Sequence, residues 1–161
     1  MSPRTALPVL PADTGEDTAR ALCAWMAAEP DAVGHEWCVV LAEDGYGSLP
    51  PAAEALPAQV AAFAAGMLAA GGDDDASARL LAGGAERGRA LALAEVGHAE
   101  VMRLHFLLRE ALWRAAQRLA PSARAAEHAM AWLDPPLAMA ASAALSAARA
   151  DPDGDGIALA A

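Results

Sequence analysis

The stretch RGRALALAEVGHAEVMRLHFLLREALWRAAQRL, residues 87–119, decides the fold that we expect for this chain. From Val101 onward its apolar residues recur at helical spacing and spread over roughly 200° of the helix surface. A helix that rests on a single neighbour needs an apolar stripe of only about half that width. We therefore expect this helix either to be wedged between neighbours or to pack on its own domain and on a second subunit.

The remaining arc of this helix is mostly polar, with Leu107 as the apolar exception. Within the apolar arc, Val101, Leu104, Leu108 and Leu112 are expected to fill the core of the domain. An exposed apolar patch of this size is uncommon in monomers. We therefore expect the chain to form a homodimer, and the interface residues predicted from the pattern are Met102, Phe106 and Trp113.

Three polar residues, His98, His105 and Arg109, fall inside the apolar arc and form the candidate ligand-binding group. His98 and His105 are seven residues apart, about 10 Å along a helix axis, which is too far for both to bind one metal ion. His105 and Arg109 stand at i and i+4, and an arginine there suits a carboxylate or phosphate. A histidine in a helical pocket can also be an axial ligand to haem. The commoner arrangement would hydrogen-bond His105 in the core or a subunit interface and pair Arg109 with a carboxylate.

The composition indicates an all-α protein. The chain has 161 residues, of which 56% are hydrophobic but only 4% aromatic, and alanine supplies much of the apolar fraction. Alanine is the best helix former, and no alternating run predicts a strand. We expect one domain over 14–149, a globin-like or orthogonal bundle of about six helices, between a flexible lead at 1–13 and an acidic tail at 150–161. The helical patterns cover about 14–29, 31–41, 53–70, 73–93, 98–120 and 122–149.

Glycine and proline suggest where these helices are interrupted. Asp31, after Pro30, is expected to cap the second helix. Gly83, Gly84 and Gly88 are expected to loosen the fourth helix. The run Asp134-Pro135-Pro136 is expected to kink or restart the last helix, with Asp134 as its cap.

The formal net charge of −10 opposes binding to nucleic acid or to an anionic membrane surface. No signal peptide is visible, and the uncharged run at 55–72 is mostly alanine and glycine around Pro57, which indicates a buried helix rather than a membrane span. Cys23 and Cys38 are expected to be small buried hydrophobic residues in a reducing compartment. These features favour a cytoplasmic protein.

No motif predicts catalysis or a resident cofactor. The sequence has no HExxH, no paired ExxH of a di-iron bundle, no glycine-rich phosphate loop and no nucleophile signature. The tail at 151–156 matches the first six positions of a calcium loop, but no glutamate stands at the twelfth position. We therefore expect neither enzymatic activity nor a metal site.

The chain resembles the N-terminal sensor domains of the RsbR type, which occur in stressosome proteins and in various bacterial kinases and regulators. The resemblance lies in a Trp-bearing first helix, the run RGRALAL, the helix EVMRLHFLLREAL and the segment LDPPLAMAASAAL, and it covers roughly residues 15–149. It implies a non-haem, globin-like fold and a dimeric input or scaffold domain that works through protein contacts.

The expected function is therefore that of a non-enzymatic bacterial signalling or regulatory module. It would act by dimerisation and by contacts with a kinase or another signalling protein, and a small ligand near His105 and Arg109 would shift its helix packing. Three alternatives remain open: a haem- or tetrapyrrole-binding sensor with His98 or His105 as axial ligand, a ferritin-like metalloenzyme bundle, and an adaptor held by its tail at 151–161.

Overall fold

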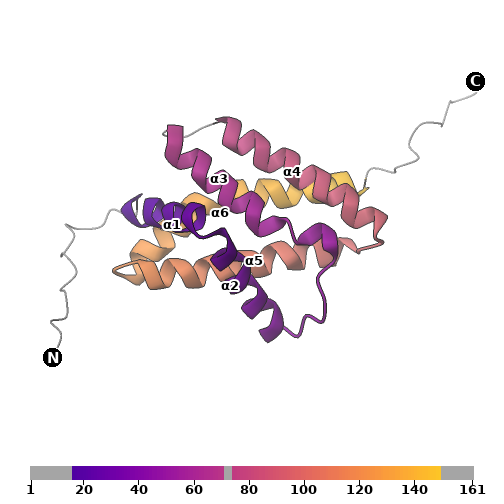
Figure 1. Cartoon of the computed structure of the whole chain (residues 1–161), viewed down its shortest axis with the longest axis horizontal. Helices are drawn as coiled ribbons and strands as arrows, with labels where there is room; N and C mark the ends of the chain where they lie inside the picture. The colour runs from indigo at the N-terminus through magenta and orange to yellow at the C-terminus, as the bar shows by residue number, and fades with distance from the viewer. Residues whose placement is uncertain (1–15, 71–73, 150–161) are drawn as a thin grey trace, which may run out of the picture.

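Six α-helices make up the described part of this chain, residues 16–70 and 74–149 of a computed structural model (Figure 1). No strand occurs in these two ranges, so the expected all-α class is confirmed. The expectations for the lead at 1–13, the helix start at Thr14 and the tail at 150–161 lie outside the described residues. The elements are α1 (Glu16–Ala28), α2 (Pro30–Glu43), the short 3₁₀ turn η1 (Pro51–Ala53), α3 (Leu56–Ala70), α4 (Asp74–Leu93), α5 (His98–Leu119) and α6 (Ala123–Arg149).

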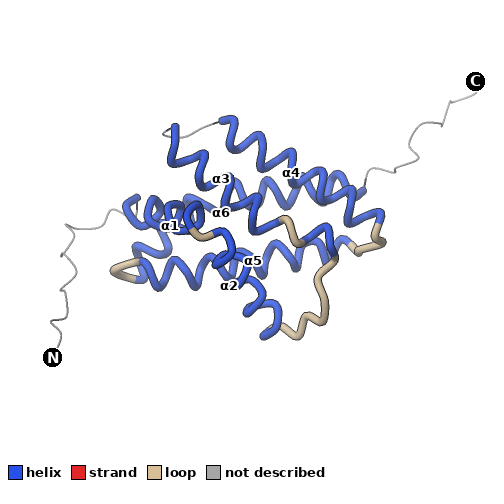
Figure 2. The backbone as a smooth tube through the Cα atoms, viewed as in Figure 1, coloured by secondary structure: helices blue, strands red, loops and turns tan. Residues whose placement is uncertain are grey.

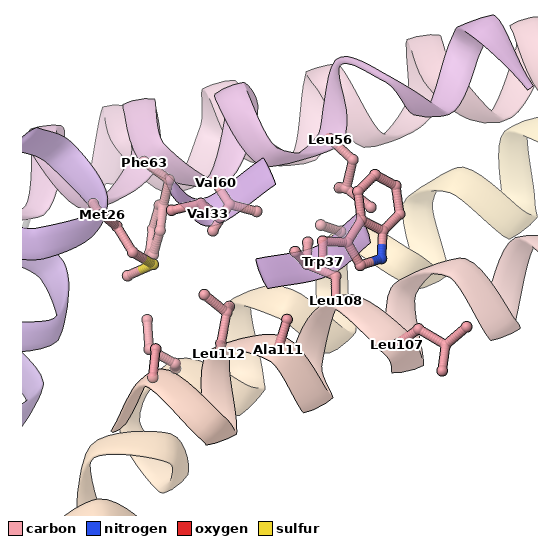
Figure 3. Close-up of a cluster of buried hydrophobic side chains, with 14 of the residues drawn as sticks. Met26, Val33, Trp37, Leu56, Val60, Phe63, Leu107, Leu108, Ala111 and Leu112 are labelled. Carbon is pink, nitrogen blue, oxygen red and sulfur yellow. The ribbon is translucent and has the colours of Figure 1, made fainter. Parts of the chain in front are cut away.

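Helix α6 packs against α4 and α5, its two most extensive neighbours, and also against α1. Figure 1 shows α3 and α4 side by side and antiparallel, while α2 packs along α5. A long loop, drawn in tan in Figure 2, connects α2 to η1. The hydrophobic core receives buried side chains from all six helices. In its centre, Trp37 of α2 lies between Leu56 of α3 and Leu108 of α5 (Figure 3).

Helix α5 is wedged between α2 and α6, which accounts for most of its wide apolar arc. Leu107, the apolar exception on the polar arc, is only 6% exposed. The reason is that α2 covers this flank, and acidic residues of α2 and its C-cap Asp44 pair with arginines of α5. These pairs are Arg103–Asp44, Arg114–Glu43 at 2.6 Å and Arg118–Glu36 at 2.7 Å.

Glycines bring α4 and α6 into close contact rather than loosening α4, contrary to expectation. A Cβ atom added at Gly88 would lie 2.0 Å from the carbonyl oxygen of Ala144. One added at Gly84 would lie 2.6 Å from the carbonyl oxygen of Ala140. Because both neighbours are backbone atoms of α6, any side chain at either glycine would force the two helices apart.

Helices α2 and α4 end in the same way, with a residue in the left-handed region followed by an apolar residue that packs on the core. In α2 these residues are Gly45, with φ 75°, and Tyr46, whose N–H donates to the carbonyl of Leu41 at 2.9 Å. In α4 they are Glu95, with φ 57°, and Val96, whose N–H donates to the carbonyl of Leu91 at 2.9 Å. This is the Schellman arrangement, which glycine normally completes. The expected break between the helical patterns at 73–93 and 98–120 is confirmed, and Gly97 is the N-cap of α5.

The starts of α2 and α3 differ from expectation. Pro30 occupies the first turn of α2 and Glu29 is the N-cap, so Asp31 lies within the helix and does not cap it. Proline suits that position because its missing N–H would have no helical partner there. Helix α3 begins at Leu56 instead of 53 because η1 precedes it. None of the described helices has the length and apolar character needed to span a membrane.

Helix α6 runs through Pro135 and Pro136 without a restart, so of the two outcomes expected there, a kink or a restart, the restart is wrong. Asp134 is not a cap, since its carboxylate pairs with Arg109 of α5. Buried residues on both sides of the prolines, Leu133 and Ala140 among them, hold the helix against its neighbours. Packing therefore offsets the two backbone hydrogen bonds that the prolines cannot donate.

The two cysteines lie in different surroundings. Cys23 of α1 is buried, as expected, and burial raises the pKa of its thiol to about 11. Cys38 of α2 is exposed, so the expectation that both thiols are buried is wrong for this residue.

Candidate functional site

His105, on the α4-facing side of α5, has hydrogen bonds at both ring nitrogens. Its Nδ1 lies 2.8 Å from the carbonyl oxygen of Val101, and its Nε2 lies 3.0 Å from Nη2 of Arg87. A carbonyl only accepts and a guanidinium only donates. The ring therefore carries its hydrogen on Nδ1 and accepts from Arg87 at Nε2.

Arg87, on α4, is the central residue of this cluster and is only 3% exposed. One end of its guanidinium donates to Oε1 of Gln59 on α3, and the other end donates to His105 on α5. Its Nε has no hydrogen-bond partner. The cluster Gln59–Arg87–His105 thus joins α3, α4 and α5, and both groups that accept hydrogen bonds from Arg87 are uncharged. Among the described residues no carboxylate pairs with Arg87.

The charges of the cluster follow from its burial. Burial lowers the pKa of Arg87 to about 10, so the guanidinium remains a cation near neutral pH. Burial, together with the nearby charge of Arg87, lowers the pKa of His105 to about 4, although the Val101 carbonyl acts in the opposite direction. The imidazole is therefore neutral near pH 7.

This arrangement leaves His105 no free nitrogen for chemistry. Its Nε2 lone pair would have to lose the hydrogen bond from Arg87 before it could act as a general base or ligate haem iron. A metal cation at this nitrogen would also approach the buried positive charge of Arg87.

Arg109 has a different partner. Its Nε and Nη2 each lie 2.7 Å from one carboxylate oxygen of Asp134, which forms a bidentate ion pair between α5 and α6. The pair is partly exposed, with side-chain exposures of 43% and 35%. Such pairs stabilise modestly, by about 1 kcal/mol or less. The pair links the two helices and engages the Nε and Nη2 donors of the guanidinium.

The candidate ligand-binding residues His98, His105 and Arg109 have different surroundings, and the two expected to converge on one ligand, His105 and Arg109, have partners on different helices. His98 is exposed at the first residue of α5, while His105 points to α4 and Arg109 to α6. In the part of the chain that the structure describes, no hydrogen bond or ion pair joins any two of them.

Arg87 is the site residue that sequence reasoning missed. Its position relative to the glycines could have indicated it, since Gly83, Gly84 and Gly88 lie on the same face of the helix as residue 87. That face packs against α3 and α6. A charged residue on such a face must be buried with polar partners.

The residues predicted for the dimer interface lie partly on the surface. Phe106 is 63% exposed and Met102, one turn away on α5, is 45% exposed. Trp113 is partly buried and packs against the core. The exposed apolar face of α5 is therefore centred on Met102 and Phe106, and we call it the α5 face.

Among the described residues, no group of three or more His, Cys, Asp or Glu side chains is placed to hold a metal ion. Comparison of the chain with protein-family models, with curated proteins and with solved structures finds no match. The site is therefore interpreted from its own geometry.

Proposed function

We propose that this chain is a non-enzymatic signalling or regulatory module of the RsbR sensor type that acts by dimerisation and by contacts with other signalling proteins. The observation that carries the proposal is the α5 face, where Met102 and Phe106 remain exposed on a helix that is otherwise wedged into its own domain. The engagement of His105 and Arg109 by partners within the chain supports a non-catalytic role.

The α5 face suits a two-fold contact with a second copy. In such a contact the same patch serves both subunits, so that Met102 and Phe106 of each copy meet their equivalents. Burying the exposed parts of these four side chains contributes about 5 kcal/mol. Since association itself costs a comparable amount, we expect a weak dimer that a change in helix packing can strengthen or dissociate.

Sedimentation equilibrium from about 10 µM to about 1 mM tests this proposal. We expect the wild-type chain to shift from monomer to dimer over this range, and we expect Phe106→Glu to remain monomeric because two like charges would meet in the contact. Met139→Glu is the matched control, since Met139 is also exposed, at 54%, but lies on α6. A wild-type chain that stays monomeric, or a dimer broken by the Met139 variant alone, would refute the assignment to the α5 face.

A further inference from the structure

A cavity of about 260 Å³ lies between α3, α4 and α6, away from the Arg87 cluster and the α5 face. Phe63 of α3 and Leu80 of α4 form its inner wall, and both are nearly completely buried. Trp132 and Met139 of α6 line it as well and are 42% and 54% exposed. The cavity is therefore open to solvent on the α6 side, and a ligand can enter without unfolding the bundle.

The side chains that line the cavity carry no charge. Its polar side-chain groups are the hydroxyl of Ser77 and the indole of Trp132, and the other lining residues are aliphatic, aromatic, proline or methionine. An ion would lose its hydration here without a compensating partner. The lining therefore selects an uncharged ligand, and its methionines can adapt to an aromatic ring.

Pro135 and Pro136 leave two backbone carbonyls of α6 without their usual helical donors. In an α-helix the carbonyl of residue i points to the nitrogen of residue i+4. The carbonyls of Ala131 and Trp132 therefore point to the two prolines, which have no N–H to donate and which line the cavity. A ligand with an N–H or O–H group can satisfy an acceptor that α6 itself leaves without its usual donor.

The volume sets the size of the ligand. An engineered apolar cavity of about 150 Å³ binds benzene, so a cavity of about 260 Å³ has room for a second fused ring. This is smaller than the pockets of about 300 Å³ or more that hold drug-sized molecules.

We propose that the cavity between α3, α4 and α6 binds a small, uncharged, two-ring aromatic molecule that carries one hydrogen-bond donor. The aromatic faces of the ligand contact Phe63 and Trp132, and its N–H or O–H group reaches the carbonyl oxygens of α6 beside the prolines. For a ligand of about ten non-hydrogen atoms, this predicts a Kd on the order of 100 µM. The cavity shares no residue with the α5 face, so this proposal does not rest on the proposed dimer.

Two probes of equal shape test the proposal. Indole has an N–H donor, whereas benzothiophene has the same two-ring outline without one. Each is titrated into the full chain by calorimetry, and amide chemical shifts in NMR locate the site. We expect indole to saturate with shifts centred on Phe63, Leu80 and Trp132.

The double variant Pro135→Ala/Pro136→Ala restores the missing N–H groups and so occupies the acceptors. We expect the preference for indole over benzothiophene to fall about fivefold in this variant, while the affinity for benzothiophene changes little. Leu81→Trp fills the cavity from α4, and Met139→Trp fills it from the exposed rim should the first variant fail to fold. Both are expected to abolish binding.

The proposal is overturned by any of three results: no binding of indole up to about 1 mM, shifts centred outside the cavity, or unchanged binding in a folded filled variant. The proposal is also overturned if Met139→Trp changes the self-association of the chain while indole does not bind to the wild type. The cavity would then be the binding site for a second copy of the chain. Sedimentation of Phe106→Glu separates this outcome from failure of the proposed function, since that variant tests only the α5 face.

Discussion

The neutral state of His105 predicts a specific loss of stability in mild acid. Burial and the charge of Arg87 lower the pKa of folded His105 to about 4, from 6.5 for an unperturbed histidine. Between these two values the unfolded chain binds a proton that the folded chain does not. The contribution of His105 is therefore fully present above about pH 6.5 and is lost as the pH falls towards 4.

The size of this effect follows from the shift. The full difference corresponds to about 3 kcal/mol, and about 2 kcal/mol of it is lost between about pH 7 and about pH 5. His105→Gln removes the titration but keeps a side-chain oxygen that can accept from Arg87. We therefore expect the variant to lose about 2 kcal/mol less stability than the wild type over the same pH interval.

Urea unfolding followed by far-ultraviolet circular dichroism at the two pH values measures this difference. Leu93→Gln serves as the control, because it introduces the same residue at an exposed position of α4. NMR adds a direct readout, in which the ring signals of His105 stay constant down to about pH 5. Equal losses in the wild type and in His105→Gln, or a ring that titrates near pH 6.5, would refute the buried, neutral histidine.

Two further predictions concern the backbone. Gly88→Ala is expected to lower the free energy of unfolding by about 2 kcal/mol or more, because its Cβ would lie 2.0 Å from the Ala144 carbonyl oxygen. Gly34→Ala in α2 has only ordinary contacts, at 3.9 Å, and is expected to be stabilising by up to about 1 kcal/mol. Glu95→Gly is expected to stabilise the chain by about 1 kcal/mol, since Glu95 adopts a left-handed conformation, and Gly45→Ala to destabilise it by a similar amount. Urea unfolding of the four variants measures these changes in stability. A Gly88→Ala variant as stable as the wild type would contradict the first prediction, and a Glu95→Gly variant less stable than the wild type would contradict the second.

Much of the helix layout was predictable because local chemistry marks helix ends. The last helical pattern was expected to begin at about 122, and the N–H of Ala125 donates to Oγ of Ser122 as a capping residue requires. The left-handed turn after α4 was not predictable from residue type, since Glu95 occupies a position where glycine is usual. The location of that break was still apparent from the gap between the helical patterns at 73–93 and 98–120.

The errors arose where tertiary packing outweighed a local rule. A pair of prolines breaks an isolated helix, but Leu133 and Ala140 bury the helix on both sides of them. A glycine lowers helix propensity, but at Gly88 the absence of a side chain lets α6 approach. Neither effect can be derived without knowing which helix lies opposite.

The candidate site was harder to predict than the fold. The pattern identified the helix face that holds His105 and Arg109, but their partners come from other helices. Arg87 lies 18 residues before His105, and Asp134 lies 25 residues after Arg109. A helical wheel shows which residues share a face of a helix, but it does not show which other helix packs against that face.

These contacts provide a physical route from the cavity to the α5 face. The cavity is lined by α3, α4 and α6, and α5 is held to α4 by Arg87–His105 and to α6 by Arg109–Asp134. A ligand that changes the spacing of α4 and α6 must therefore either strain these two links or carry α5 with it. The links are polar and directional, so they hold in one geometry and weaken steeply outside it. A ligand can shift this packing only by as much as its affinity differs between the two arrangements. A weakly binding molecule is therefore sufficient only if the dimer that we propose is itself weak.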